Sequence, residues 1–212
     1  MNDALQSRLC QGLPIFPLPR TVLMPGELLP LHVFEERYRA LIRFCLDGDG
    51  YMGIATLVPG HHLSGDAVPP VFPEIGVGRI VQHQPLPDGR SNIILESLGR
   101  LQLTRELEQT EPFRIVQCEP MPMRDEDVRS QLQQLCVLVL QLGALSEDAG
   151  REAQRLVALS NEEMVDSLAR KLLRDPDDRR AYLAAMGRSV RINMVQAGLS
   201  RFLRMPDEVP EA

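Results

Sequence analysis

The chain has 212 residues, of which 44% are hydrophobic and 25% charged, with a net charge of -6. This length can hold one large domain or two small ones, each with its own core. The negative charge argues against extensive coating of nucleic acid, which requires an excess of positive charge.

Strands are predicted first along the chain. Residues 13–18 and 27–34 are short apolar runs that prolines interrupt or flank. Because proline cannot donate to a sheet ladder, such runs belong to sheet edges, strand starts or bulges. Pro25-Gly26 marks the turn between them.

After Phe34 the apolar positions recur at helical spacing. They are Tyr38, Leu41, Ile42, Cys45 and Leu46. The glycine-rich segment 47–50 ends this pattern. One amphipathic helix is therefore expected here.

Further strands are predicted at 51–58, 76–84, 91–105 and 112–119. Asp88-Gly89 separates two of them and is a strong hairpin signal between apolar runs. Gly99 allows a bulge or a close backbone approach within its strand. About six strands with a single helix indicate a small closed or nearly closed barrel, since closure removes exposed edges.

Beyond a boundary near residues 120–124 every periodic signal is helical. One apolar stripe consists of Val128, Leu132, Leu135, Val139 and Leu142. Val137, Leu138 and Leu140 widen it, so this helix is expected to be buried on more than one face.

The later helices carry recognisable boundaries. A short helix is predicted over Arg151–Leu159, and Ser160 with Glu163 has the spacing of a capping box. Asp175-Pro176 begins another helix, with Asp as the cap and Pro at its first position. Val190–Met205 is predicted as the last helix.

The predicted organisation is thus a β-barrel domain with one helix over residues 1–121 and an α-helical domain over 122–206. The remaining segment, 207–212, is predicted to be a disordered tail.

Four segments together form a recognisable pattern. They are Leu13–Leu18 with Leu23–Gly26 and Leu29–Val33, then Glu35–Arg39, then Pro87–Gly89 with Leu95–Leu101, and finally Asp177–Leu183. In this order and spacing they resemble the amino-terminal domain of Lon proteases over most of residues 13–205. The resemblance implies an α+β protein, with a PUA-like small β-barrel followed by an α-helical bundle. It also implies a role in binding protein substrates or partners.

The catalytic parts of such proteases are not found. A P-loop needs a glycine-rich segment with a lysine, and the single lysine, Lys171, lies in a predicted helix with no glycine near it. Lon proteolysis uses a Ser-Lys pair in a separate domain, and none follows here. We therefore expect a stand-alone, non-enzymatic binding module with no cofactor.

The expected partners are polypeptide substrates or a partner protein, such as an ATPase or protease acting in trans. Glu36, Arg37 and Arg39 are the best candidates for partner contacts, because they display mixed charge on the polar side of the first predicted helix. The alternative is that they form only a solvated face. The sequence does not indicate an oligomeric state.

RNA binding by a PUA-like protein is the alternative function, since residues 170–204 carry nine basic residues. The net charge, the scarcity of aromatics for base stacking and the single lysine argue against it. This basic stretch can equally be the solvated face of terminal helices or a docking surface for an acidic partner.

A third hypothesis is a hydrolase or metal site in the loop that holds His61, His62, Ser64 and Asp66. Adjacent histidines in an extended segment point to opposite sides, and no nearby Cys or His completes a tetrahedral site. A polar surface loop is the preferred interpretation, so neither a catalytic residue nor a metal ligand is predicted.

The four cysteines, Cys10, Cys45, Cys118 and Cys136, show no disulfide-like or metal-binding spacing. Free, buried thiols in a reducing compartment are expected. The first residues lack the features of a signal peptide, and no apolar run approaches the roughly 18 residues of a membrane span. A cytoplasmic protein is predicted.

Overall fold

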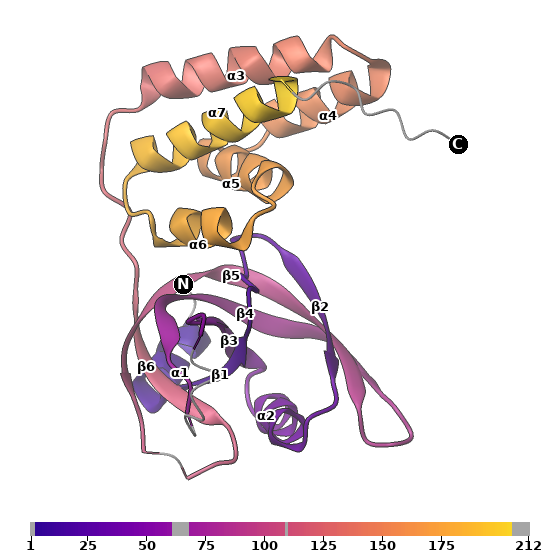
Figure 1. The fold of residues 1–212 in the computed structure, drawn as a ribbon, viewed down its shortest axis with the longest axis vertical. Helices are drawn as coiled ribbons and strands as arrows, with labels where there is room; N and C mark the ends of the chain where they lie inside the picture. The colour runs from indigo at the N-terminus through magenta and orange to yellow at the C-terminus, as the bar shows by residue number, and fades with distance from the viewer. Residues whose placement is uncertain (1–2, 61–67, 109, 205–212) are drawn as a thin grey trace. The chain divides into compact units, whose positions relative to one another are not determined.

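The computed structural model describes all residues except 1–2, 61–67, 109 and 205–212. The loop with His61, His62, Ser64 and Asp66 and the predicted tail, 207–212, therefore lie outside the described residues. The chain forms two compact units, Met1–Met121 and Pro122–Ala212 (Figure 1). Among the described helices, none has the length and apolar character to cross a membrane.

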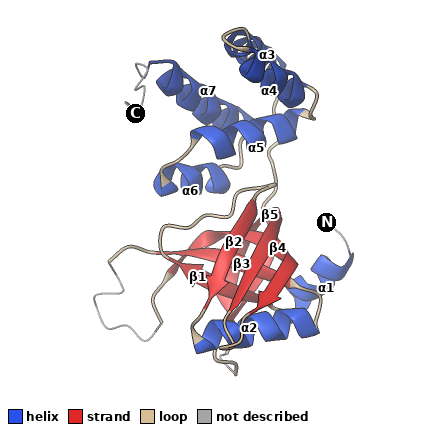
Figure 2. Ribbon diagram, turned by 90° about the vertical axis from the view of Figure 1, so that its right-hand side faces the viewer, coloured by secondary structure: helices blue, strands red, loops and turns tan. Residues whose placement is uncertain are grey.

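The first unit is built on one sheet with the strand order β2-β5-β4-β3-β1-β6 (Figure 2). The strands are β1 (Leu13–Leu18), β2 (Leu28–Val33), β3 (Tyr51–Leu57), β4 (Val71–Pro85), β5 (Ser91–Glu106) and β6 (Arg114–Pro120). All pairs are antiparallel except β1 with β3. β5 also pairs with β6, which closes β5, β4, β3, β1 and β6 into a ring. The predicted α+β class with a small barrel is confirmed.

β5 is the strand that closes this ring, because its two halves have different partners. Ser91–Glu96 pairs with β2, whereas Leu101–Glu106 pairs with β6. Between them the register with β4 shifts by one residue, and Gly99 has a φ of 147°. A left-handed φ is accessible mainly to glycine, so the bulge predicted at Gly99 is present where the strand changes partner.

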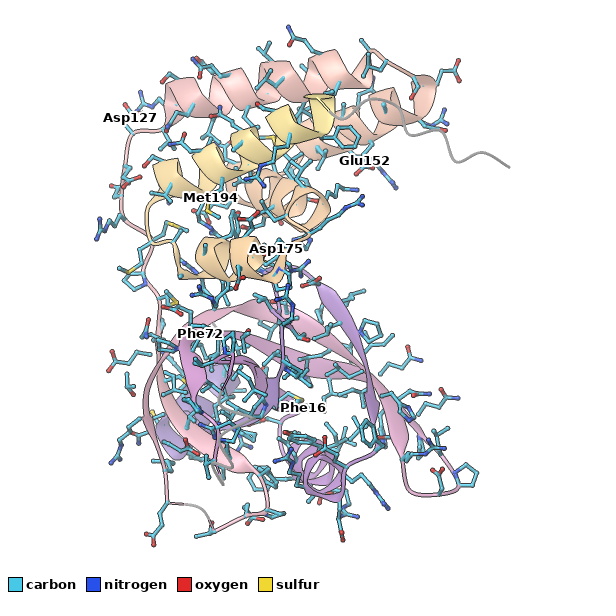
Figure 3. All side chains as sticks on the ribbon, in the orientation of Figure 1. Phe16, Phe72, Asp127, Glu152, Asp175 and Met194 are labelled. Carbon is cyan, nitrogen blue, oxygen red and sulfur yellow. The ribbon has the colours of Figure 1, made fainter. Side chains whose placement is uncertain are left out.

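Helices cover two separate apolar clusters of the barrel. α2 (Glu36–Asp47) contributes Tyr38, Leu41, Ile42 and Cys45 to one of them. Phe16 of β1 faces α2, and its ring stacks on Tyr38 with centroids 4.0 Å apart (Figure 3). β1 and β3 are buried on both faces, and accordingly their sequences are almost entirely apolar, with Thr56 as the polar exception.

The expectation of one helix in this unit was wrong, since α1 (Asp3–Gln11) precedes β1. Only Leu5 and Leu9 of this helix are buried, within the second apolar cluster. Two apolar positions give a weak periodic signal, so α1 depends on docking to the barrel. Arg8 assists by donating from Nε to Asp49 at 2.8 Å.

The β1–β2 connection crosses the barrel at a point where only glycine fits. A Cβ on Gly76 would collide with the carbonyl oxygen of Leu23, and one on Gly78 would lie 2.7 Å from the Glu96 oxygen. Leu23 itself is fully buried. Gly76 is thus required by the close approach of the β1–β2 connection, and Gly78 by that of the β5 backbone at Glu96.

The second unit consists of five described helices. They are α3 (Arg129–Gly143), α4 (Glu147–Val157), α5 (Asn161–Leu172), α6 (Pro176–Ala184) and α7 (Arg188–Arg204). The predicted capping box is present, because Ser160 accepts from the Glu163 N–H and Glu163 accepts from the Ser160 N–H. Asp175 caps α6 with Pro176 at its start, as predicted.

Two expectations for this unit require correction. The predicted helix Arg151–Leu159 begins earlier, at Glu147, because Ser146 caps it by accepting from the Ala149 N–H at 3.1 Å. In α3 only the stripe with Leu135 and Val139 is buried. Val137 and Leu140 are 52% and 49% exposed, so the expected burial of a second face is not found within the described residues.

All four cysteines are free thiols, but they differ in exposure. Cys45 and Cys118 are buried, as expected, whereas Cys10 is exposed and Cys136 is half-buried. Burial raises the pKa of Cys45 and of Cys118 to about 12 in each case. These two thiols therefore stay protonated at neutral pH.

We expect Gly76→Ala to lower the free energy of unfolding by about 2–3 kcal/mol, because the added methyl group overpacks a rigid backbone contact. Gly53→Ala is the matched control in the same barrel. Its nearest neighbours are flexible side-chain atoms 3.1 Å away, so a loss of about 1 kcal/mol is expected. Urea unfolding measures both, and equal losses would contradict the role assigned to the Leu23 crossing.

Labelling with a thiol-reactive probe at pH 7.5 should modify Cys10 first. Cys45 and Cys118 should react only after unfolding, since the thiolate is the reactive form and burial suppresses it. Peptide mapping of the labelled protein at successive times checks this order. Fast labelling of Cys45 in the folded protein would overturn it.

Candidate functional site

The three predicted partner-contact residues lie in the first turn of α2 but do not form one site. Glu36 and Arg37 are exposed. Arg37 donates from Nε to Glu35 at 2.9 Å, and its guanidinium lies 4.5 Å from the centroid of the Tyr38 ring. Arg37 is thus held flat against the helix, next to a small cavity.

Arg39 has a different environment, because it lies against the β4–β5 hairpin. It is half-buried, and its Nε has no hydrogen-bond partner among the described residues. A Cβ on Gly89 would collide with its guanidinium. The Gly89 turn, with a φ of 81°, therefore rests directly on Arg39. Arg39 positions the hairpin, while Glu36 and Arg37 remain accessible.

The cavity beside Arg37 has a volume of about 100 Å³. It is lined by Pro17, Arg37, Tyr38, Leu57, Val68, Pro69, Pro112, Phe113 and Arg114. Arg114 is already engaged, since it donates to both carboxylate oxygens of Glu106 at 2.8 and 2.6 Å. Burial raises the pKa of Tyr38, whose hydroxyl donates to the Pro17 carbonyl. This cavity has room for one small side chain and no free ionic group among these contacts.

An exposed apolar surface of the first unit follows the outer face of β2. We call Leu28, Pro30, His32 and Phe34 the β2 stripe. Leu28 and Phe34 are each 60% exposed. His32 lies between them, with its ring 6.2 Å from that of Phe34 and its Nδ1 2.7 Å from the Asn92 side-chain oxygen. An aromatic and aliphatic surface of this kind favours contact with apolar side chains.

The stripe was not identified from the sequence, although a signal was present. A strand with one solvated face normally alternates apolar and polar residues. In β2 the inward residues Leu29, Leu31 and Val33 are apolar, but so are Leu28 and Pro30 on the other face. Within the described residues, β2 pairs with another strand on one side only. Apolar residues on both faces of such an edge strand indicate a candidate contact surface.

The helical unit has a groove of about 720 Å³ lined by residues of α3, α4, α5, α7 and the start of α6. Its floor includes Val139, Leu156, Leu168 and Leu199. Two ion pairs stand at its rim, Lys171–Glu152 at 2.9 Å and Arg201–Asp178 at 3.2 Å.

These pairs also bear on the basic stretch 170–204. Lys171, Arg188, Arg191 and Arg201 each contact a carboxylate. Their charges are therefore largely neutralised within the unit, which weakens the case for a nucleic-acid surface.

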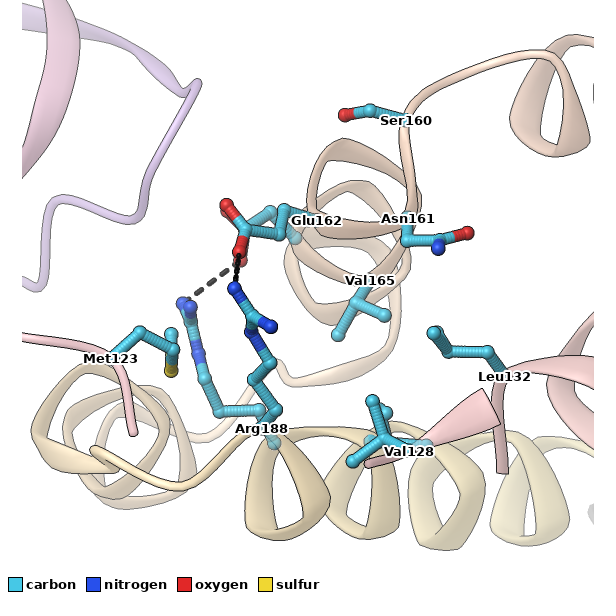
Figure 4. A pocket seen from close by; sticks show the side chains of 11 residues that line it. Met123, Val128, Leu132, Ser160, Asn161, Glu162, Val165 and Arg188 are labelled. Atoms are coloured by element: carbon cyan, nitrogen blue, oxygen red, sulfur yellow. Dashed lines mark hydrogen bonds and ion pairs between the residues drawn. The ribbon is translucent and has the colours of Figure 1, made fainter. Parts of the chain in front are cut away.

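A second hollow, of about 320 Å³, lies between the start of α3, α5 and α7 (Figure 4). Val128, Leu132 and Val165 form its apolar wall, and Arg188 reaches Glu162 at 2.9 Å on the opposite side. Arginines and carboxylates are equally represented in its lining. The hollow therefore presents no excess charge to a ligand.

The buried side of this hollow contains an ion-pair cluster that joins three helices. Asp166 of α5 accepts from the Tyr182 hydroxyl at 2.6 Å and from Arg191 at 2.8 Å. The Arg191 guanidinium lies 4.1 Å from the Tyr182 ring centroid. Burial raises the pKa of Asp166 and outweighs the opposing effect of Arg191. Because every member of the cluster is engaged with another, it serves to lock α5, α6 and α7 together.

Comparison with protein families identifies a match over residues 12–198 to the substrate-binding domain of ATP-dependent protease La (LON). The chain is 29% identical over 101 residues to a Lon protease of Cytophaga hutchinsonii and 33% identical over 102 residues to one of Dictyoglomus thermophilum. Each match covers 48% of this chain and 12% of the relative. The chain thus spans only a small part of the length of these relatives.

Solved structures show the same fold. The N-terminal domain of a Mycobacterium avium complex Lon protease aligns with a TM-score of 0.69 at 14% identity, covering 89% of this chain and 98% of that one. A Lon N-terminal domain protein from Xanthomonas campestris aligns with a TM-score of 0.62 at 22% identity, covering 88% and 97%. The predicted resemblance is confirmed.

Substitution of Asp166 by Asn should lower the free energy of unfolding of the helical unit by about 3–5 kcal/mol, since it leaves Arg191 buried without its counter-ion. Lys171→Met removes a largely exposed pair with Glu152 and should change it by less than about 1 kcal/mol. Urea titration followed by circular dichroism at 222 nm measures both. Similar losses for the two variants would show that the Asp166 cluster is not a lock.

Proposed function

Because the chain belongs to the family of LON substrate-binding domains, we propose that it binds segments of other polypeptides and catalyses no reaction itself. The observation that carries this proposal is the β2 stripe, an exposed apolar surface on the barrel of a fold whose family is described as binding substrate. An unfolded chain offers apolar side chains that a folded protein hides. Such side chains can be buried against the β2 stripe and so be removed from water.

The energetics of this contact are set by a few large side chains. Complete burial of a Leu or Phe side chain contributes about 1.5–3 kcal/mol. Leu28 and Phe34 are already partly covered, so each gains less than that on binding. Two such contacts supply less than the roughly 8 kcal/mol of a complex with a micromolar dissociation constant, so the stripe alone gives weaker binding, which suits reversible capture and release of many different segments.

Glu36 and Arg37 provide the polar rim in this proposal. They begin α2 just after Phe34, so mixed charge stands next to the apolar stripe. A rim of this kind affects association rate and specificity more than affinity. Arg39 acts indirectly, by holding the β4–β5 hairpin that contains the Arg90 neighbour of His32.

A partner ATPase or protease acting in trans is the second proposed class of ligand, supported by the Lon proteases among the relatives. The two classes can be separated by the state of the ligand, since a substrate binds when unfolded and a partner enzyme binds when folded.

The test uses a permanently unfolded model polypeptide, reduced and carboxymethylated α-lactalbumin, labelled with a fluorophore. The chain should bind it weakly in fluorescence anisotropy, with a Kd of roughly 100 μM or above. The double variant Leu28→Glu/Phe34→Glu should weaken binding at least about tenfold, because two apolar contacts are replaced by charges, and 1.4 kcal/mol corresponds to a factor of ten.

Leu98→Glu is the matched control, since Leu98 is 46% exposed on β5 but lies outside the stripe. It should leave the Kd within about twofold of the wild-type value. If the wild-type chain does not bind, or if both variants lose affinity equally, the β2 stripe is not the binding surface. Arg37→Glu should change mainly the salt dependence of binding.

A further inference from the structure

The longest uncharged segment of the helical unit lies on its surface. Residues 130–146 contain no Asp, Glu, Lys or Arg, in a chain of which 25% is charged. Most of this segment is α3. This helix packs chiefly against α4 and α7, and both lie on the same side of it (Figures 1 and 2).

The opposite side of α3 carries a second apolar stripe. It consists of Gln133, Val137, Leu140 and Ala144, which recur at three- and four-residue steps and are all exposed. Leu145, just beyond the helix, is 73% exposed. We call these five residues the α3 face. A solvated helix face normally carries charged residues, and this one has none.

We propose that the α3 face is the contact surface between two copies of this chain. A two-fold contact places the same patch of each copy against itself, so a charge near the axis would meet its own like charge. The chain as a whole carries a net charge of -6, which makes most of its surface unfavourable for self-contact. The α3 face avoids this repulsion, because its residues are uncharged, mostly apolar and able to form reciprocal amide hydrogen bonds through Gln133.

The size of the surface limits the strength of the contact. A helix of 15 residues is about 22 Å long, so an α3–α3 pair alone buries less than the roughly 800 Å² per partner of a standard interface. The dimer is therefore weak, with a dissociation constant in the micromolar range or above. It forms independently of the polypeptide binding assigned to β2.

Sedimentation velocity of the full chain from 5 to 500 μM tests this inference. The wild-type chain should shift from monomer to dimer across this range. Val137→Glu/Leu140→Glu should remain monomeric at 500 μM, while the control Val190→Glu, at a position 49% exposed on α7, should dimerise as the wild type does. Circular dichroism establishes that each variant is folded.

A charge-swap experiment distinguishes a two-fold contact from non-specific association. Leu140→Glu and Leu140→Arg should each be monomeric alone. An equimolar mixture should recover the dimer, because Leu140 lies near the middle of the α3 face, where a two-fold axis through that face brings the two copies of the residue together. A wild-type chain that stays monomeric at 500 μM would overturn the proposal. So would dimerisation that survives both Leu140 substitutions, or a mixture that stays monomeric. The Leu140 variants should bind the unfolded polypeptide as well as the wild-type chain does. A loss of the dimer can therefore be told apart from a failure of the proposed polypeptide binding.

Discussion

The architecture of the first unit depends on one constraint, the change of partner along β5. This strand must pair with β2 in its first half and with β6 in its second, while β4 follows it on the other side. A regular strand cannot turn this way, and the bulge with Gly99 in a left-handed conformation provides the bend. Closing the ring through β6 leaves β2 outside it, attached on one side only within the described part of the chain.

The position of β2 explains why an apolar stripe can stay exposed there. The Ser97 N–H donates to the Glu27 carbonyl at 2.8 Å. In an antiparallel pair every second residue points its N–H and C=O groups at the partner strand, so Leu29 and Leu31 point theirs at β5. The N–H and C=O groups of the residues between them, such as Leu28 and His32, point toward the open edge. Pro30 has no N–H to offer, which interrupts the row of donors that another strand would need. The edge is therefore blunted against strand addition, whereas the outward side chains remain available for contact.

Much of this fold could be predicted because its signals are local. Three such signals each depend on a few adjacent residues. They are the hairpin turn at Asp88-Gly89, the capping box of Ser160 with Glu163, and the N-terminus of α6 at Asp175-Pro176. α1 could not be predicted, since Leu5 and Leu9 are buried only through docking on the barrel. The closure between β5 and β6 and the Leu23 crossing over Gly76 are likewise tertiary, and no neighbouring residues encode them.

The candidate surfaces show the same division between local and tertiary information. Charge on α2 was visible in the sequence, but only the structure shows that Arg39 supports the Gly89 turn while Arg37 stays accessible. Apolar residues on both faces of β2 and of α3 were also visible, and in α3 they were interpreted as burial. Single apolar residues are common on the surfaces of folded proteins, so an apolar residue does not by itself indicate burial. The grouping of several exposed apolar residues, as around Phe34 and Val137, is what favours contact with another chain.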